Sequence, residues 1–255
     1  MKLIIAANWK MHKTGAETEA FCREFTREAA AFKKTDAIIC PPFTALATAQ
    51  EALKSSGVFL GAQNLFWEKK GAYTGEISIE MLREFNVTHV IVGHSERRTL
   101  MGETDTDVRR KIHAVVDSGL IPILCIGETS LERENNETEK ILVSQLRQAV
   151  SGLPAEQAEN LVIAYEPVWA IGTGQAASPP DAEFAADLIR TTINSFFNAK
   201  VAETLRIQYG GSVNADNIGS FVKIPSINGA LVGGASLEPD TFSSLIKAAE
   251  KAVSN

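Results

Sequence analysis

Short apolar runs alternate with longer amphipathic stretches along the chain, and this alternation predicts strands separated by helices. The runs Val90-Ile91-Val92 and Ile121-Pro122-Ile123-Leu124 are continuously apolar. Such runs are typical of parallel strands that are buried on both faces. Strands are expected at residues 3–7, 36–40, 58–63, 88–93, 121–126, 161–166, 205–210 and 229–233.

The amphipathic stretches predict helices, most clearly at 17–33, 105–118, 132–151 and 179–198. Asn86 and Gly119 follow helices at positions where a left-handed cap is favoured. Ser178-Pro179 is typical of an N-cap followed by proline at the first helical position.

This repeated pattern in 255 residues predicts a single closed (β/α)8 TIM barrel spanning residues 1–255. A doubly wound open sheet also alternates strands and helices. The barrel is favoured because polar and glycine-rich residues follow many strands, whereas an open sheet gathers its binding residues near one switch point.

Charge, apolar segments and cysteine content argue against several classes of partner and site. The net charge is −6 and there is no long basic run, which argues against nucleic acid or an anionic membrane as partner. The apolar start is too short for a signal-peptide core, and no segment approaches a membrane span. The three cysteines are scattered without a CxxC pair, which favours a reducing cytoplasm over a disulfide scaffold or a zinc site.

Two titratable residues end buried strands. A carboxylate such as Glu166 is costly there unless it is solvated, paired or functional, and we expect it to be functional. His94 precedes the first turn of a short helix, whose N-terminus disfavours the imidazolium, so a neutral ring is expected. His89 and His113, in contrast, are expected to be structural. A carboxylate base beside a neutral imidazole suits proton abstraction next to a carbonyl.

Several further residues follow strands. Lys10 is either a surface lysine or a fixed charge for an anionic substrate. The paired glycines Gly210-Gly211 and Gly233-Gly234 end the last two strands, where backbone N–H groups can bind phosphate. The loop at Ala170–Gly174 has the composition of a cover that closes over a site.

Two other segments have less defined expectations. Cys125 is expected to be a packing residue, and Glu128 to pair with a base such as Arg98. The long loop Asn64–Ser78 is expected to be functional or to bind a partner, and its aromatic residues argue against disorder.

Taken together, these motifs closely resemble the triosephosphate isomerase family. The matching blocks are Asn8-Trp9-Lys10-Met11, Gly61–Asn64, Gly71–Glu76, Gly93-His94-Ser95-Glu96-Arg97-Arg98, Cys125–Glu128, Tyr165-Glu166-Pro167 through Gly174, Tyr209–Ser212 and Leu231–Ala235.

The resemblance implies an isomerase that interconverts dihydroxyacetone phosphate and D-glyceraldehyde 3-phosphate through an enediolate. It implies Glu166 as the base, His94 as the group polarising the carbonyl, and Lys10 as the compensating charge. This glutamate–histidine pairing is the family's own and does not follow from spacing.

By the same resemblance, the remaining site residues have implied roles. Asn8 places the substrate, and Glu96 supports the catalytic residues. Phosphate is held by Gly172, Ser212, Gly233 and Gly234. The family needs no metal and no organic cofactor. It works as a cytoplasmic homodimer in which the loop carrying Thr74 inserts beside the partner's site.

Three other functions remain open on the residues alone. They are a Schiff-base aldolase using Lys10, a binding protein on an inactive barrel, and a nucleotide site at the Gly172 loop. The last is weak, because loop residues separate the glycines from the strand.

Overall fold

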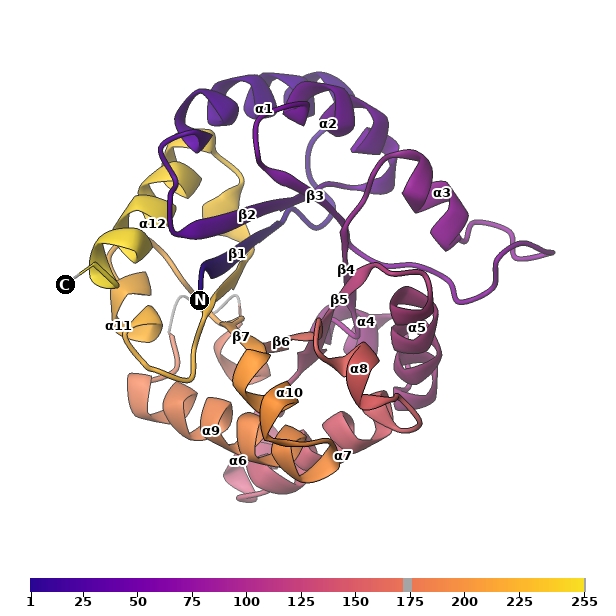
Figure 1. Ribbon diagram of the computed structural model, residues 1–255, viewed down its shortest axis with the longest axis vertical. Coiled ribbons are helices and arrows are strands. Elements are labelled where there is room, and N and C mark those ends of the chain that lie inside the picture. The colour runs from indigo at the N-terminus through magenta and orange to yellow at the C-terminus, as the bar shows by residue number, and fades with distance from the viewer. Residues whose placement is uncertain (172–175, 255) are drawn as a thin grey trace.

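A computed structural model describes residues 1–171 and 176–254. Within them, parallel strands form a closed barrel in which each strand pairs with the next and β1 pairs with β8 (Figure 1). The strands are β1 (Leu3–Asn8), β2 (Thr35–Cys40), β3 (Phe59–Ala62), β4 (His89–Val92), β5 (Ile121–Ile126), β6 (Val162–Tyr165), β7 (Arg206–Tyr209) and β8 (Gly229–Val232). The expected barrel is therefore confirmed and the open sheet is excluded.

Helices surround this barrel. The α-helices are α1 (Gly15–Ala29), α2 (Leu46–Leu53), α3 (Ile79–Glu84), α4 (Ser95–Leu100), α5 (Asp105–Asp117), α6 (Ser130–Glu134), α7 (Thr138–Val150), α8 (Ala155–Ala158), α9 (Pro179–Phe196), α10 (Ala199–Thr204), α11 (Ile218–Val222) and α12 (Pro239–Ala252). Short 3₁₀ turns are η1 (Phe43–Ala45), η2 (Val168–Ala170) and η3 (Gly234–Ser236). No helix of the described residues is long and apolar enough to cross a membrane.

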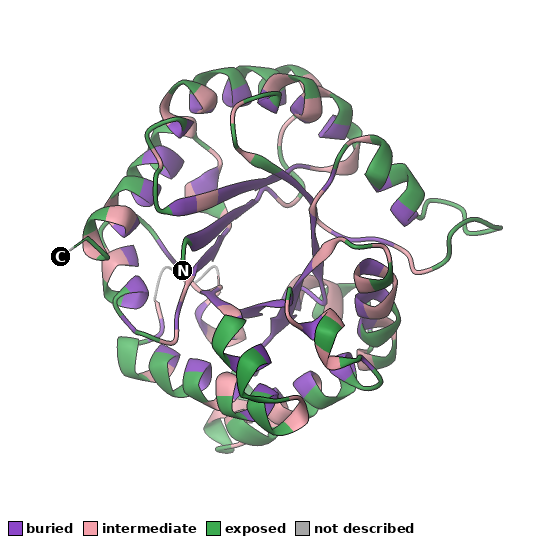
Figure 2. Ribbon diagram, viewed as in Figure 1, coloured by how far each residue is buried: buried purple, intermediate pink, exposed green. Residues whose placement is uncertain are grey.

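The strands are buried on both faces, as their uninterrupted apolar runs predict (Figure 2). Alternate residues of β1 illustrate this. Ile4 and Ala6 belong to a cluster inside the barrel, while Leu3, Ile5 and Ala7 pack in the layer between strands and helices. Polar side chains are costly in either layer, so residues just beyond the strand ends are the natural carriers of chemistry.

Local capping sets most helix ends. Ser178 caps α9 with a complete capping box and Pro179 in the first turn, as predicted. Asn86 and Gly119 have positive φ values of 55° and 78°, also as predicted. The expected single helix over 132–151 is wrong. It is divided into α6 and α7, because the chain turns at Asn136, whose φ is 56°.

The segment between β3 and α3 contains no helix or strand and projects away from the barrel (Figure 1). Aromatic side chains of this segment pack against one another. The ring of Phe66 lies 4.1 Å from that of Trp67 and 4.6 Å from that of Tyr73. The expectation that these aromatic residues prevent disorder is confirmed.

His89 opens β4 and lies buried, with Nδ1 2.8 Å from the hydroxyl oxygen of Thr88. Burial, together with the charge of Arg206, lowers the pKa of His89 to about 3. In the unfolded chain the ring has its ordinary pKa, near 6.5. As the pH falls below that value, the unfolded state takes up a proton that the folded state does not, so stability falls.

We therefore expect the free energy of unfolding to fall by about 2 kcal/mol from pH 7 to pH 5 because of His89. Urea denaturation at both pH values, at fixed protein concentration, measures this loss. In His89→Asn the loss should be smaller by that amount, whereas His113→Asn, which removes a histidine on α5, should behave like the unmodified protein. If the two variants lose equal stability, His89 does not carry the effect.

Candidate active site

A cavity of about 340 Å³ lies at the carboxyl ends of the strands. Its lining brings together seven of the predicted residues from distant parts of the chain: Asn8, Lys10, His94, Glu166, Ser212, Gly233 and Gly234. The predicted Gly172 lies outside the described residues. Thr74 is exposed on the projecting loop and is not among the residues that line the cavity.

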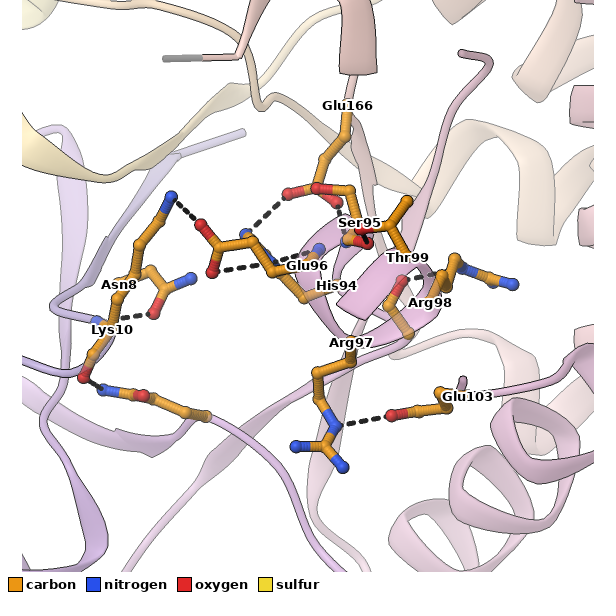
Figure 3. A network of polar contacts seen from close by, with 12 residues as sticks. Asn8, Lys10, His94, Ser95, Glu96, Arg97, Arg98, Thr99, Glu103 and Glu166 are labelled. Carbon is orange, nitrogen blue, oxygen red and sulfur yellow. Dashed lines mark hydrogen bonds and ion pairs between the residues drawn. The ribbon is translucent and has the colours of Figure 1, made fainter. Parts of the chain in front are cut away.

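Glu166 directly follows β6 and is only 2% exposed. The N–H of Ser95, at the start of α4, donates to its Oε2 over 2.8 Å, and Nε2 of His94 lies 2.9 Å from its Oε1 (Figure 3). A helix N-terminus and an imidazole thus face one buried carboxylate, which favours its ionised form.

The charges of this pair depend on each other. Burial alone would raise the pKa of Glu166, but His94, the Ser95 N–H and Lys10 outweigh it, and the pKa is lowered. Burial alone would lower the pKa of His94, but the Glu166 carboxylate outweighs it, and the pKa is raised. Contact with Glu166 therefore acts on the pKa of His94 in the direction opposite to the helix N-terminus.

The second ring nitrogen of His94 makes a backbone contact. Nδ1 accepts a hydrogen bond from the N–H of Glu96 over 3.3 Å, so His94 itself caps α4. An acceptor at Nδ1 places the proton of a neutral ring on Nε2, the nitrogen that faces the cavity.

Lys10 has an unusual backbone conformation, with a φ of 53°. Its N–H donates to Oδ1 of Asn8 over 3.1 Å, and its carbonyl accepts from Nε2 of Gln63 over 2.9 Å. Its ammonium is bound to a carboxylate oxygen of Glu96 (Figure 3). Glu96 also lies 3.6 Å from Nδ1 of His94, so it stands between the two groups.

Backbone after β7 and β8 forms another part of the cavity lining. A Cβ added at Gly233 would lie 3.5 Å from Cε of Lys10, so this glycine is next to the ammonium-bearing side chain. A Cβ at Gly234 would meet nothing within 4 Å, so packing does not require glycine there. Ser212 donates to the carbonyl of Ala170 over 3.2 Å, which joins this part of the lining to the segment after Glu166.

Glu128 pairs with a base, as expected, but the base is Arg133, whose Nη1 lies 3.8 Å from Oε1 of Glu128, and not Arg98. Arg98 is bound by Asp105 at 2.6 Å and by the carbonyl of Gly93 at 2.8 Å. Glu128 is fully buried and also accepts from Trp169 Nε1 over 2.8 Å and from the Tyr165 hydroxyl over 3.1 Å. Cys125 is a buried free thiol, as expected.

Two contributors were missed by sequence reasoning. Gln63 belongs to one of the matching blocks, and a glutamine just after a strand can reach the backbone of neighbouring strand ends. Besides Lys10, it binds the carbonyl of Cys40 over 2.9 Å. The N–H of Ser95 could have been proposed as an anion donor from its place at a helix start.

Two other features of the molecule lack the properties of a ligand or metal site. A larger cavity, about 790 Å³, lies at the amino-terminal end of the barrel near Lys2 and Arg190. The guanidinium of Arg190 is bound there by backbone carbonyls, so it is not presented to a ligand. Among the described residues, no group of three or more His, Cys, Asp or Glu side chains could hold a metal ion.

Comparisons of this sequence with known proteins identify one family. The family model described as triosephosphate isomerase matches residues 3–249. The triosephosphate isomerase of Dictyoglomus thermophilum is 52% identical over 244 residues, covering 96% of this chain and 98% of the relative. That of Carboxydothermus hydrogenoformans is 48% identical over 246 residues, with coverage of 96% and 98%.

Proposed function

Since the chain belongs to the triosephosphate isomerase family and interconverts dihydroxyacetone phosphate and D-glyceraldehyde 3-phosphate, we propose that Glu166, His94 and Lys10 carry out this reaction. The reaction is a step of glycolysis and gluconeogenesis. One observation carries the assignment. A buried, ionised carboxylate lies 2.9 Å from an imidazole in the cavity that Lys10 also lines.

Glu166 is the base in this proposal. It removes a proton from C1 of dihydroxyacetone phosphate and returns it to C2, so the carboxylate is regenerated in each turnover. To reach the substrate, the carboxylate must leave its contacts with Ser95 and His94. Gly210 leaves space beside the Glu166 side chain, because an added Cβ there would lie only 2.9 Å from Cγ of Glu166.

His94 donates a hydrogen bond from Nε2 to the carbonyl oxygen as that oxygen gains charge. The departure of Glu166 removes the main cause that raises the pKa of His94. Burial then dominates, so the ring is neutral when the enediolate forms, and its Nδ1 stays fixed by the N–H of Glu96.

Lys10 compensates the negative charge of the enediolate and the phosphate, and Asn8 fixes the Lys10 backbone beside the cavity. Glu96 holds the ammonium until substrate arrives. The backbone at Ser212, Gly233 and Gly234 binds the phosphate, and we assign the same role to Gly172. The proposal includes no metal and no organic cofactor.

Isomerisation of dihydroxyacetone phosphate in deuterated water tests this chemistry. We expect the product to carry solvent deuterium at C2, because a carboxylate base exchanges its proton with solvent, and turnover in EDTA should be unchanged. Borohydride added with substrate should cause no inactivation, because no Schiff base forms on Lys10. Inactivation by borohydride, or product without deuterium, would contradict the proposed chemistry.

We also propose that the enzyme is a homodimer. The projecting loop is ordered but packs little against its own barrel, and Met11, next to Lys10, is 94% exposed. Leu100 and Met101, at the end of α4, are 74% and 68% exposed. Exposed apolar side chains near a protruding loop favour contact with a second copy, in which the Thr74 loop lies beside the partner's Lys10.

Thr74→Arg is expected to give monomers whose kcat is at least about tenfold lower, because the neighbouring site loses its support. Sedimentation velocity and turnover, measured across a concentration series, should change together. Thr241→Arg, on the exposed side of α12, is the matched control and should stay dimeric and active. A fully active Thr74→Arg monomer would show that the loop serves another purpose.

We propose the cytoplasm as the place of action. The three cysteines are all free and buried, which suits a reducing compartment.

A further inference from the structure

The chain segment that carries Glu166 lies directly against the segment that follows β5. The N–H of Glu166 donates to the carbonyl of Ile126 over 2.8 Å, and the N–H of Val168 donates to the carbonyl of Glu128 over 3.1 Å. These bonds continue the pairing of β5 with β6 past the ends of both strands. The position of the Glu166 backbone is therefore set by residues 126–128.

Gly127 is the closest point of this contact. A Cβ added there would lie 1.7 Å from the carbonyl oxygen of Glu166, so the two backbones touch and only glycine fits. Any movement of the Gly127 backbone is consequently transmitted to Glu166.

Gly127 is held by one side chain of an outer helix. Its N–H donates to Oε1 of Gln145 over 2.9 Å, and Nε2 of Gln145 donates back to its carbonyl over 3.2 Å. Gln145 lies on α7 and is half-buried, whereas Gly127 is buried. Because buried backbone groups need partners, loss of this amide leaves both Gly127 groups to find new ones.

We propose that Gln145 is a positioning residue for Glu166, acting through the Gly127 backbone. Gln145 touches neither the cavity nor the reacting atoms. It fixes the backbone of Glu166 through Gly127. The inference rests on the proposed role of Glu166. Small displacements of a catalytic group have large effects on rate, so fixing its backbone matters for kcat more than for binding.

Gln145→Met removes the amide at nearly constant volume. We expect kcat to fall about tenfold, with little change in KM or in inhibition by inorganic phosphate, because the phosphate side of the cavity is formed by other strands. Gln145→Glu keeps the acceptor for the Gly127 N–H but loses the donor, and its kcat should be intermediate. Gln148→Met, on the same helix, is the matched control. Gln148 binds Asp105 and Ser144, and its loss should leave kcat unchanged.

A double-mutant cycle tests whether the effect passes through Glu166. In Glu166→Asp the carboxylate is already displaced, so adding Gln145→Met should lower kcat less than twofold further. An equal loss in both backgrounds, a loss in KM instead of kcat, or an equal loss in Gln148→Met would overturn the proposal. If Glu166→Asp alone kept full kcat, the role of Glu166 would fail. Unchanged kcat in Gln145→Met would remove only the role of Gln145.

Discussion

Glu166→Gln is expected to lower kcat by about 10³-fold or more, because no other group can take up the proton at the same place. General-base catalysis alone contributes roughly 10²–10⁴. The Glu166 carboxylate also raises the pKa of His94, so its loss changes the electrostatics of two groups at once. Turnover of both triose phosphates, followed by a coupled assay, measures the effect.

The substitution is close to isosteric, so the loss should not come from unfolding. The amide oxygen of glutamine can still accept from the N–H of Ser95, which holds the carboxylate at 2.8 Å in the unmodified protein. Glu159→Gln, which removes a surface carboxylate paired with Lys200, is the control and should keep full activity. A Glu166→Gln variant with more than about a tenth of the original kcat would refute the assignment of the base.

The barrel was predictable from sequence because its strands leave a strong signal. A strand buried on both faces must be apolar throughout, and each of the expected runs became a strand. The boundary between α6 and α7 was not predictable in the same way. It depends on the left-handed conformation of Asn136, which asparagine tolerates but does not require.

The site was only partly predictable. Strand-end positions indicated His94 and Glu166, but their charges depend on a contact between residues that are 71 or more positions apart, as the Ser95–Glu166 bond shows. A basic partner for Glu128 was predictable, but its identity, Arg133 and not Arg98, was not, because sequence proximity does not say which helix turns toward a buried carboxylate. Gln145 left no signal at all, since a glutamine on a helix is ordinarily a solvated residue.

Lys10→Met is expected to lower kcat by about 10²-fold or more and to weaken inhibition by phosphorylated enediolate mimics. A fixed cation beside the place where negative charge develops contributes far more than one on an open surface. The structure supplies a further reason. Asn8 and Gln63 hold Lys10 in a backbone conformation that non-glycine residues seldom adopt, and Glu96 binds its ammonium. Kinetics and inhibitor titration at constant ionic strength measure both effects.

Methionine retains the side chain out to Cε, the atom beside Gly233, so that packing should persist and the loss should reflect charge. Lys13→Met provides the comparison. Lys13 also has a positive φ, of 74°, but its ammonium lies over the rings of Trp9 and Phe21, outside the cavity lining. Removing that charge should change kcat little. If Lys10→Met keeps the original inhibitor affinity, or if both variants lose activity equally, then Lys10 is an ordinary surface lysine and the anionic intermediate is stabilised by the backbone alone.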